Sequence, residues 1–393
     1  MKRKNFKKRA DHHARLNEIG FQYHSVVSDD GAEYWTEGVA YEFTLRQIEE
    51  IEAVSEELHE MCMETVEEII ESGDYPEGFK LSEQSKSLIE HSWRNADMHI
   101  YGRFDFLVTP EGAIKMYEYN ADTPTALLES AVAQWRWLEE TEGVPHRDQF
   151  NSIHEKLIAR WARAKALTDA PVLYLLATRE GPQEDWGNVE YMADTAMQGG
   201  WQINIEEIEN VGYDARHAMF VDAADTPIEH AFKLYPWEWM MEEAFGAHVI
   251  NCPMQWYEPP WKMLLSNKAI LPVLWKRYPE HANLLPAFFE GEKPAASFQH
   301  MFVKKPILGR EGANIQLSGT FADTLIDGSH QVPEYDAYGY IYQQYAPLPQ
   351  FEGRHPVIGS WIVGDEPAGI GIREDNTIIT GNGSHFVPHY FVN

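Results

Sequence analysis

The sequence predicts an α+β fold with a small α/β unit near its middle. Three features indicate this: a long amphipathic helical pattern over residues 41–72, alternating strand and helix patterns from about 170 to 250, and short strands separated by glycine and proline turns after about 260. With 393 residues, the chain is long enough for two or three packed units that share large cores. Hydrophobic residues make up 44% of it, as in ordered globular proteins.

The first third of the chain is predicted to contain three helices and a hairpin. A helix is expected over residues 41–72 and another over SEQSKSLIEHSW, residues 82–93. Two short strands then flank the turn TPEG, and a third helix is expected from about Pro124 to Glu140. Thr123 can cap this last helix, with Pro124 at its first position. The apolar residues of the first helix recur at steps of three and four: Ile48, Ile51, Val54, Leu58, Met61 and Val66.

The middle of the chain alternates strands and helices. PVLYLLA, WQINIEEI and HAMFVD have strand patterns, and a helical pattern surrounds NVEYMADTAMQGG. This rhythm is typical of a βαβ unit with a parallel sheet. The aromatic segments FKLYPWEWM and QWYEPPWKM are expected to pack between units.

The last third is predicted to begin with a helix, PPWKMLLSNKAILPVLWKRY, and to continue with strands. The expected strands are HMFVKKP, YIYQQYAPLP, PVIGSWIVGDEPAGIGIRED and NTIITGNG. We find neither an internal repeat nor a low-complexity linker in the sequence, so composition alone gives no sharp unit boundaries.

Composition excludes several classes of function. The formal net charge of −30 argues against a nucleic-acid partner, which requires clustered lysine and arginine. Cys62 and Cys252 are the only cysteines, so neither a disulfide framework nor a cysteine zinc site is expected, and a reducing, cytoplasmic location is favoured. The basic N-terminus lacks the apolar run of a secretory signal, and no apolar run is long enough to span a bilayer.

The hairpin IYGRFDFLVTPEGAIKMYEYN carries polar residues where an aromatic-rich strand pair would favour apolar ones. Arg103, Asp105, Glu118 and Asn120 alternate along the two strands, so all four project from the same face. Two carboxylates and an amide oxygen, with no nitrogen or sulfur ligand, suit Mg²⁺ better than zinc. An adjacent arginine is unnecessary for the metal but useful for a phosphate that bridges to it.

The register and surroundings of this hairpin can be predicted as well. If Val108 pairs with Ala113 across the turn, Arg103 lies opposite Glu118. The alternative is a solvated face of an edge hairpin, where charged residues are routine. The helix expected directly after the second strand favours a ligand site, because free N–H groups at a helix N-terminus attract anions.

Residues late in the chain complete a possible nucleotide site. FVKKPILGREGANI places lysines at a strand end before a loop with glycines, which let the backbone approach phosphates; the alternative is a charged hairpin turn. YIYQQYAPLP suits a hinge that pairs with an adenine edge, or an ordinary buried strand. Structural explanations are open for two further candidates. Lys268 could extend from an apolar helix to solvent, and Arg373 could form a surface ion pair. The chain contains no P-loop, H-E-x-x-H, G-x-S-x-G or complete G-x-G-x-x-G motif.

The combination of these segments resembles the glutathionylspermidine synthase family. GRFDF, YEYNADTPT, FKLYPWEWM, SNKAILPVLW, VKKPILGREGANI, YQQY and GIRE occur in this order over nearly the whole chain. The resemblance is greatest to the stand-alone bacterial members, which are described as acid–amine ligases. It implies an ATP-grasp fold in the rearranged, glutathione-synthetase-like order, with an inserted small α/β pre-ATP-grasp domain. The implied divisions are 1–165 with the metal hairpin, 166–258 as the pre-ATP-grasp substrate domain, and 259–393 with the lysines, glycine-rich loop and hinge.

The resemblance also assigns roles to particular residues. It implies ATP and Mg²⁺, with two ions, as cofactors, and the metal ligands Asp105, Glu118 and Asn120. Arg103 corresponds to the arginine that stabilises the transferred phosphoryl group, and Arg373 resembles a phosphate contact. The residues that match nucleotide contacts are Lys268, Lys305, the flap residues Gly309, Arg310 and Gly312, the hinge residues Gln343, Gln344, Tyr345 and Ala346, and Ile378 and Ile379 near the base.

Substrate residues are less well matched. Thr123 and Thr125 stand where the bifunctional members have serines that contact the acid, and Glu184 and Asp185 resemble an acidic pair of the substrate pocket. We expect no counterpart of the N-terminal cysteine amidase domain of those members.

The implied activity is an ATP-dependent ligase that forms an amide from a small acid or peptide and an amine through an acyl phosphate. Two alternatives stay open: a nucleotide-binding protein with slow ATPase activity, and a metal-dependent phosphohydrolase that uses the same Asp-Glu-Asn face. The sequence leaves the substrates and the oligomeric state open.

Overall fold

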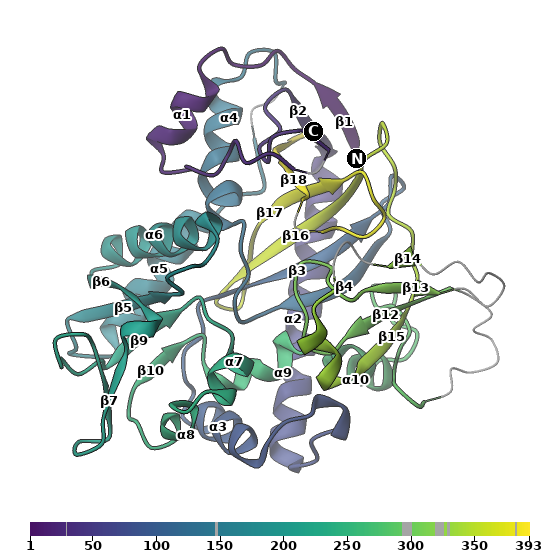
Figure 1. The fold of residues 1–393 in the computed structure, drawn as a ribbon. Helices are drawn as coiled ribbons and strands as arrows, with labels where there is room; N and C mark the ends of the chain where they lie inside the picture. The colour runs from purple at the N-terminus through teal and green to yellow at the C-terminus, as the bar shows by residue number, and fades with distance from the viewer. Residues whose placement is uncertain (29, 146–147, 293–300, 319–325, 328–330, 382) are drawn as a thin grey trace.

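A five-stranded antiparallel sheet lies at the centre of the molecule (Figure 1). The computed structural model describes residues 1–28, 30–145, 148–292, 301–318, 326–327, 331–381 and 383–393. The order of strands in the central sheet is β18-β17-β16-β3-β4, so the early hairpin β3–β4 joins strands from the end of the chain. These strands are β3 (Tyr101–Val108), β4 (Ile114–Asn120), β16 (His355–Val363), β17 (Glu366–Asp375) and β18 (His385–Val387).

Helix α2 (Leu45–Ser72) packs against the central sheet. It begins with a capping box, in which Thr44 Oγ1 accepts from Gln47 N while the Gln47 side chain accepts from Thr44 N. Gly73, with φ of 68°, ends it in the left-handed conformation that glycine favours. The predicted start at residue 41 is wrong, because Val39–Thr44 form strand β2.

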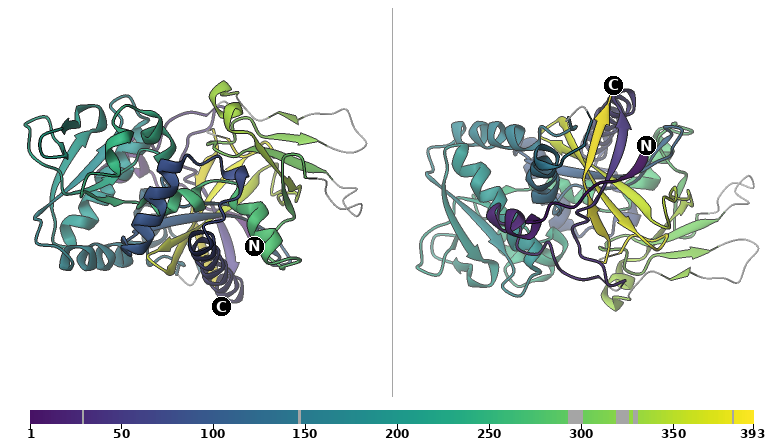
Figure 2. Two further views of the ribbon diagram at one scale, coloured as in Figure 1. Left: turned by 90° about the horizontal axis from the view of Figure 1, so that it is seen from below. Right: turned by 90° about the horizontal axis from the view of Figure 1, so that it is seen from above.

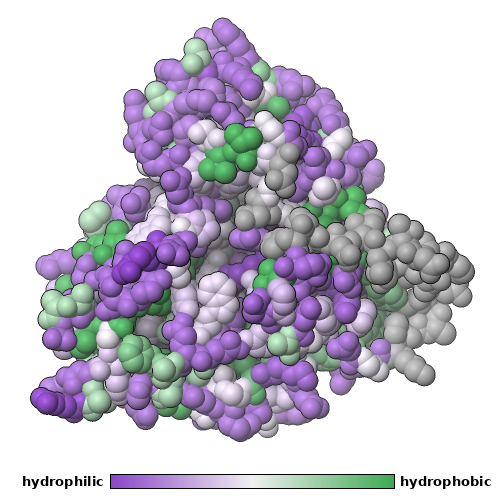
Figure 3. Space-filling model, in the orientation of Figure 1, coloured by the Kyte–Doolittle hydropathy of each residue, from purple (hydrophilic) through white to green (hydrophobic). Residues whose placement is uncertain are grey.

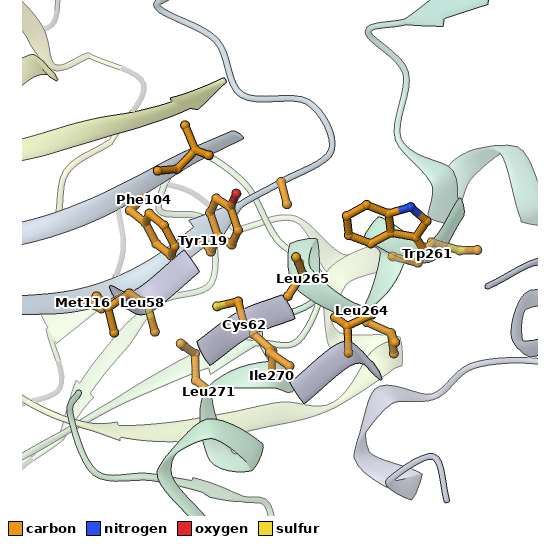
Figure 4. Close-up of a cluster of buried hydrophobic side chains, with 14 of the residues drawn as sticks. Leu58, Cys62, Phe104, Met116, Tyr119, Trp261, Leu264, Leu265, Ile270 and Leu271 are labelled. Atoms are coloured by element: carbon orange, nitrogen blue, oxygen red, sulfur yellow. The ribbon is translucent and has the colours of Figure 1, made fainter. Parts of the chain in front are cut away.

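The main core lies where α2 meets the sheet and the helices that follow residue 260. Figure 4 shows Leu58 and Cys62 of α2 among buried side chains of β3, β4 and those later helices. All of these side chains are almost completely withdrawn from solvent. The predicted apolar face of the helix is therefore confirmed.

The two chain ends meet in a separate small sheet. Strand β2 pairs antiparallel with β1 (Lys2–Asn5) and parallel with β19 (His389–Val392), which brings the termini together (Figure 2). The other helices of the first half are α1 (His12–Glu18), α3 (Glu83–Arg94), α4 (Gln134–Glu140) and α5 (Ile153–Ala166). Helix α3 confirms the helical pattern in SEQSKSLIEHSW.

The middle of the chain forms a parallel α/β unit. Its sheet has the order β10-β9-β5-β6, and the predicted βαβ unit is confirmed by β5, α6 and β6. HAMFVD does not continue that sheet: its residues form β8, which pairs antiparallel with β7 across a turn where Asp214 accepts from Arg216 N. After β8, Asp222 holds a second turn by accepting from Ala224 N and Thr226 N. The elements are β5 (Val172–Ala177), α6 (Gln183–Gln198), β6 (Gln202–Glu207), β7 (Gly212–Asp214), β8 (Met219–Val221), β9 (His230–Lys233), α7 (Trp237–Glu242), α8 (Gly246–Val249) and β10 (Gln255–Tyr257).

The last third adds two helices and another sheet of order β11-β15-β12-β13-β14. The predicted continuous helix is interrupted between α9 and α10, because extended Asn267 caps the next turn through Ala269 N. NTIITGNG forms no strand over its described residues; Asp375 instead holds a bend by accepting from Thr377 N and Gly381 N. The elements are α9 (Met263–Ser266), α10 (Ile270–Arg277), β11 (Ala287–Phe289), β12 (Phe302–Pro306), β13 (Gln316–Ser318), β14 (Ile326–Asp327) and β15 (Tyr340–Gln344).

Candidate functional site

A cavity of about 520 Å³ opens beside the hairpin β3–β4, between the α/β unit and the β11–β15 sheet. The face drawn in Figure 3 is predominantly hydrophilic, with a recess near its centre. All of the predicted site residues line this cavity: Arg103, Asp105, Glu118, Asn120, Thr123, Thr125, Glu184, Asp185, Lys268, Lys305, Gly309, Arg310, Gly312, Gln343, Gln344, Tyr345, Ala346, Arg373, Ile378 and Ile379. Their convergence is a fact of geometry, and their roles remain predictions.

The hairpin presents its four polar residues to the cavity in a register that differs from the prediction. Arg103 lies opposite Asn120, not Glu118, and Asp105 lies opposite Glu118. A bulge after Asp105 and a longer turn, which pairs Val108 with the residue after Ala113, cause the shift. The predicted common face nevertheless holds, because the bulge restores the alternation.

Asp105 is held between two arginines. Arg103 Nε donates to Asp105 Oδ1 at 2.7 Å, and Arg373 Nη2 donates to Oδ2 at 2.9 Å. Burial alone would raise the pKa of Asp105, but Arg103 and Arg373 hold it below its ordinary value. Gly359 on β16 makes room for this pair, since a Cβ there would lie 2.8 Å from Arg103 Cδ.

Two lysines face the second carboxylate. Lys268 Nζ lies 3.3 Å from Glu118 Oε2 and donates to Gly309 O at 2.7 Å, so it is not a snorkelling surface lysine. Burial would raise the pKa of Glu118, but Lys268 and Lys305 hold it below its ordinary value. Burial lowers the pKa of Lys305 to about 8. Lys304 points elsewhere, its Nζ lying 3.6 Å from the ring centre of Tyr340.

The glycine-rich loop reaches across the cavity to the segment after the hairpin. Arg310 Nη1 donates to Thr123 Oγ1 at 2.5 Å, and Nη2 donates to Glu238 Oε1 at 3.3 Å. Gly312 has φ of 71° and lies so close to Thr380 that a Cβ would be 2.7 Å from the Thr380 carbonyl oxygen. The loop is therefore fixed by contacts on both sides.

Residues 121–126 form a loop, so the predicted helix start at Pro124 is wrong. Helical structure begins at residue 127, and a π-helical stretch, Glu129–Ala133, precedes α4. Tertiary contacts override the cap signal: buried Asp122 accepts from Lys233 Nζ at 2.6 Å and from Trp237 N. At the start of this helical stretch, Leu127 N donates to the side chain of Asn188 and is therefore not free to bind an anion.

The acidic pair lies at the start of α6, on the side of the cavity formed by the α/β unit. Burial, together with the neighbouring Glu184, raises the pKa of Asp185 to about 7. Behind them, fully buried Glu129 accepts from Tyr34 Oη at 2.7 Å, and burial together with Glu184 raises its pKa to about 8. This part of the cavity is acidic, in contrast to the cationic centre.

The QQYA segment forms the opposite end. Gln344 N donates to Pro286 O, and Tyr345 N to Met301 O, while Ala346 O accepts from Tyr117 Oη at 2.6 Å. These contacts fix the segment at the end of β15, which lies between β11 and β12 in the sheet. Its apolar neighbours in the cavity wall are Leu271, Val303, Leu317, Leu348, Ile378 and Ile379.

Glu238 and Trp239 are among the cavity residues that were missed from the sequence. Trp237 of FKLYPWEWM is buried as expected, but Glu238 and Trp239 line the cavity beside Arg310. The sequence did offer a signal, because Glu238 stands between two tryptophans on a short helix. When Trp237 faces the core there, its two neighbours point in other directions and can face the cavity.

Comparisons with known proteins identify relatives of the chain. The profile of a family described as "Glutathionylspermidine synthase preATP-grasp" matches residues 3–392. A "Putative acid–amine ligase" of Haemophilus influenzae is 48% identical over 98% of both chains. Trypanothione synthetase of Crithidia fasciculata is 29% identical over 88% of this chain, and the bifunctional glutathionylspermidine synthetase/amidase of Escherichia coli is 24% identical over 92%.

The coverage of these relatives differs. The chain spans 98% of the Haemophilus protein but 55% of the trypanothione synthetase and 60% of the bifunctional enzyme. Among solved structures, a glutathione synthetase-like effector of Globodera pallida has a TM-score of 0.59 over 97% of this chain and 96% of its own, at 10% identity. That likeness shows a shared mixed α/β fold. Within the described residues, no helix combines the length and apolar character needed to cross a membrane.

Proposed function

Because this chain belongs to the glutathionylspermidine synthase family, we propose that it is an ATP- and Mg²⁺-dependent acid–amine ligase. One observation carries the proposal. In a chain with a formal charge of −30, five cationic side chains converge on one cavity around an oxygen-rich hairpin face. They are Arg103, Lys268, Lys305, Arg310 and Arg373. Such a concentration of positive charge suits a polyphosphate.

ATP fits the two halves of the cavity. The adenine is proposed to lie at Gln343–Ala346, against Ile378 and Ile379, where apolar walls meet a backbone edge. The phosphates then extend toward Lys268, Lys305 and the loop that contains Gly309 and Gly312. The volume of about 520 Å³ lies within the range of small-molecule sites.

The hairpin fits Mg²⁺ by its donor set. Asp105, Glu118 and Asn120 offer only oxygen atoms from one face, and we propose that they hold two ions. Bound there, Mg²⁺ would neutralise phosphate charge. Arg103 and Arg373 pair with Asp105, and Lys268 pairs with Glu118, so these cations lie where a metal-bound phosphate would need them.

The proposed reaction has two steps. A carboxylate oxygen of the acid attacks the γ-phosphorus, ADP leaves, and an acyl phosphate forms. The amine nitrogen then attacks the acyl carbon, inorganic phosphate leaves, and the nitrogen gives up a proton. Arg103 and Lys305 stabilise the charge that develops on the transferred phosphoryl group, and Arg373 contacts the phosphates.

The remaining cavity residues serve the substrates. Thr123 and Thr125 are proposed to contact the acid, and the Glu184–Asp185 pair to bind a cationic amine. With a pKa of about 7, Asp185 is suited to accept the proton that the amine releases. Closure of the loop over residues 309–313 would exclude water, which otherwise hydrolyses the acyl phosphate.

The finer fold assignment is part of this proposal. We propose the rearranged ATP-grasp order, with 1–165 carrying the metal hairpin, 166–258 inserted as the pre-ATP-grasp domain, and 259–393 carrying the lysines, flap and hinge. The separate parallel sheet, the early hairpin and the late β11–β15 sheet support these divisions. The partners are proposed to be small molecules.

Assaying ADP release and product mass together tests the activity. Purified protein with Mg²⁺ and ATP is incubated with small acids or peptides paired with amines and polyamines. We expect one pair to stimulate ADP release and yield an amide in equal amount. ADP without amide from any pair would favour a nucleotide-binding protein with slow ATPase activity, and cleavage of phosphate esters without ATP would favour a phosphohydrolase.

A further inference from the structure

We propose that His59, His99 and Asp365 form a site for a divalent transition metal of the zinc class, separate from the cavity. Three distant segments bring them together: His59 lies on α2, His99 directly precedes β3, and Asp365 lies in the turn between β16 and β17. One ligand atom of each lies within 4.8 Å of the other two.

The distances fit a coordination shell. Asp365 Oδ1 lies 3.0 Å from His99 Nε2 and 3.5 Å from His59 Nε2. Nitrogen and oxygen ligands about 2.0–2.1 Å from a tetrahedral Zn²⁺ are about 3.3 Å apart, so only small shifts are needed. Two imidazoles and a carboxylate, with a water completing the shell, match the chemistry of zinc and its neighbours better than that of Mg²⁺.

The surroundings hold the rings for this role. The hydroxyl of Tyr119 lies 3.2 Å from His59 Nδ1, which allows that nitrogen to carry the proton while Nε2 presents its lone pair. His99 Nδ1 has no hydrogen-bond partner among the described residues. This nitrogen can therefore carry the ring proton, which leaves the lone pair of Nε2 for the metal. Both histidine side chains are buried, whereas the Asp365 side chain is 62% exposed and leaves the metal a path to solvent.

Nearby positive charges do not block the position. Arg160 Nη1 lies 3.9 Å from Asp365 Oδ2, the oxygen that does not face the histidines, and Arg160 Nε donates to His99 O. Lys262 is paired with Glu258 at 2.6 Å. Asp365 Oδ1 therefore faces only the two histidine rings among these groups and can share a metal with them.

The site shares no ligand with the cavity, because His59, His99 and Asp365 are all absent from the cavity lining. Tyr119 follows Glu118 on β4, and because strand neighbours point to opposite faces, its ring packs in the core beside α2 (Figure 4). A bound metal would thus tie α2 and the β16–β17 turn to the start of β3, and would support the hairpin from behind.

Cobalt titration tests the site directly. Tag-free, full-length protein is dialysed against a chelator and titrated with Co²⁺, whose visible absorption reports low-coordinate nitrogen and oxygen ligation. We expect one saturable equivalent that Zn²⁺ displaces, with affinity at least about tenfold weaker in Asp365→Asn. Because Asp365 lies in an exposed turn, this variant should fold, which circular dichroism checks; His99→Gln gives a second test.

Two control variants distinguish the proposed site from other groups that could bind the metal. The double variant His12→Ala/His13→Ala removes a second group of possible ligands, which includes Glu33, and Glu118→Gln alters the hairpin face. Both should keep the cobalt spectrum, and Zn²⁺ should raise the melting temperature of wild type but not of Asp365→Asn. A spectrum lost in either control instead, no saturable binding, or equal affinity in Asp365→Asn would overturn the proposal.

Discussion

Asp105 and Glu118, the two carboxylates on the cavity face of the hairpin, are paired with cations. Asp105 contacts Arg103 and Arg373, and Glu118 contacts Lys268. The carboxylates therefore stay ionised despite burial, ready for a metal. The sequence could predict which side chains share this face, since strand alternation decides it, but not which cation neutralises which acid, because the late residues meet the hairpin only in the folded chain.

Glu118→Gln tests the metal assignment. The amide keeps the shape of the side chain but loses its charge, so we expect Mg²⁺-dependent ATP turnover to fall at least about 100-fold. The fold should be nearly unchanged, as judged by circular dichroism and thermal melting. Glu111→Gln, an exposed acid in the turn of the same hairpin, is the matched control and should retain turnover. Turnover retained in Glu118→Gln would remove this residue from the metal site.

The lowered pKa of Lys305 predicts how nucleotide affinity depends on pH. Its pKa of about 8 in the free protein is lowered by burial, and bound phosphates would raise it. Below about pH 8 the lysine is already charged, but above it binding must take up a proton, so affinity should fall by up to about tenfold per pH unit. Calorimetric titration with a non-hydrolysed ATP analogue from about pH 7.5 to about 9.5 measures this.

Two variants identify the titrating group. Lys305→Met should bind more weakly and lose the pH dependence, while Lys304→Met, whose wild-type lysine lies on the Tyr340 ring outside the cavity, should keep it. An unchanged pH profile in Lys305→Met would assign the titration to another group.

At the scale of elements, the hairpin and the segment after it show where sequence patterns stop being informative. The strands were predicted, but a longer turn and a bulge after Asp105 changed the register, and no local residue type marks a bulge of this kind. The cap signal at Thr123 failed because Asp122 is buried against Lys233, a partner far away in sequence. Local signals were thus reliable only where no buried polar group competed.

The position of the glycine-rich loop should depend on Gly312 both through its positive φ and through its close contact with Thr380. Gly312→Ala adds a Cβ at a positive φ and 2.7 Å from the Thr380 carbonyl oxygen, which pushes the loop away from the cavity wall. We expect nucleotide affinity to fall at least about tenfold. Gly353→Ala is the matched control: it has φ of 84° and nothing within 4 Å of its Cβ. Both should lose about 1 kcal/mol of stability, measured by urea unfolding.

Wild-type nucleotide affinity in both glycine variants would mean that the loop does not hold the phosphates. Reduced affinity in both would point to general destabilisation, and the shared loss of stability makes that outcome visible.

At the scale of the molecule, a buried ion pair joins the α/β unit to the hairpin. Lys233 on β9 and Asp122 after β4 are both fully buried, with Nζ and Oδ1 2.6 Å apart. Lys233→Met leaves Asp122 without its counter-ion, so we expect a loss of about 3–5 kcal/mol in the free energy of unfolding. The double variant Asp122→Asn/Lys233→Met should lose clearly less than the sum of the single variants, as measured by urea unfolding. Additive losses would mean that the pair does not couple the two units.

The arrangement of the whole cavity was the part least accessible from the sequence. Alternation and composition predicted Mg²⁺ and phosphate chemistry on the hairpin and suggested a nucleotide site late in the chain, while the resemblance was needed to assign a role to each residue of the two. Those residues come from separate elements that converge only through the order of the sheets. Glu238 and Trp239 escaped both kinds of reasoning, because which side of the short helix α7 faces the cavity is set by the burial of Trp237.

The central claim, amide formation through an acyl phosphate, is tested most directly by oxygen transfer. The acid that stimulates ADP release is labelled with ¹⁸O in its carboxylate and incubated with protein, ATP, Mg²⁺ and the amine. The account predicts one ¹⁸O atom in each inorganic phosphate released, because the attacking carboxylate oxygen stays with phosphorus when the amine displaces it. Phosphate that carries oxygen only from ATP and water would contradict it.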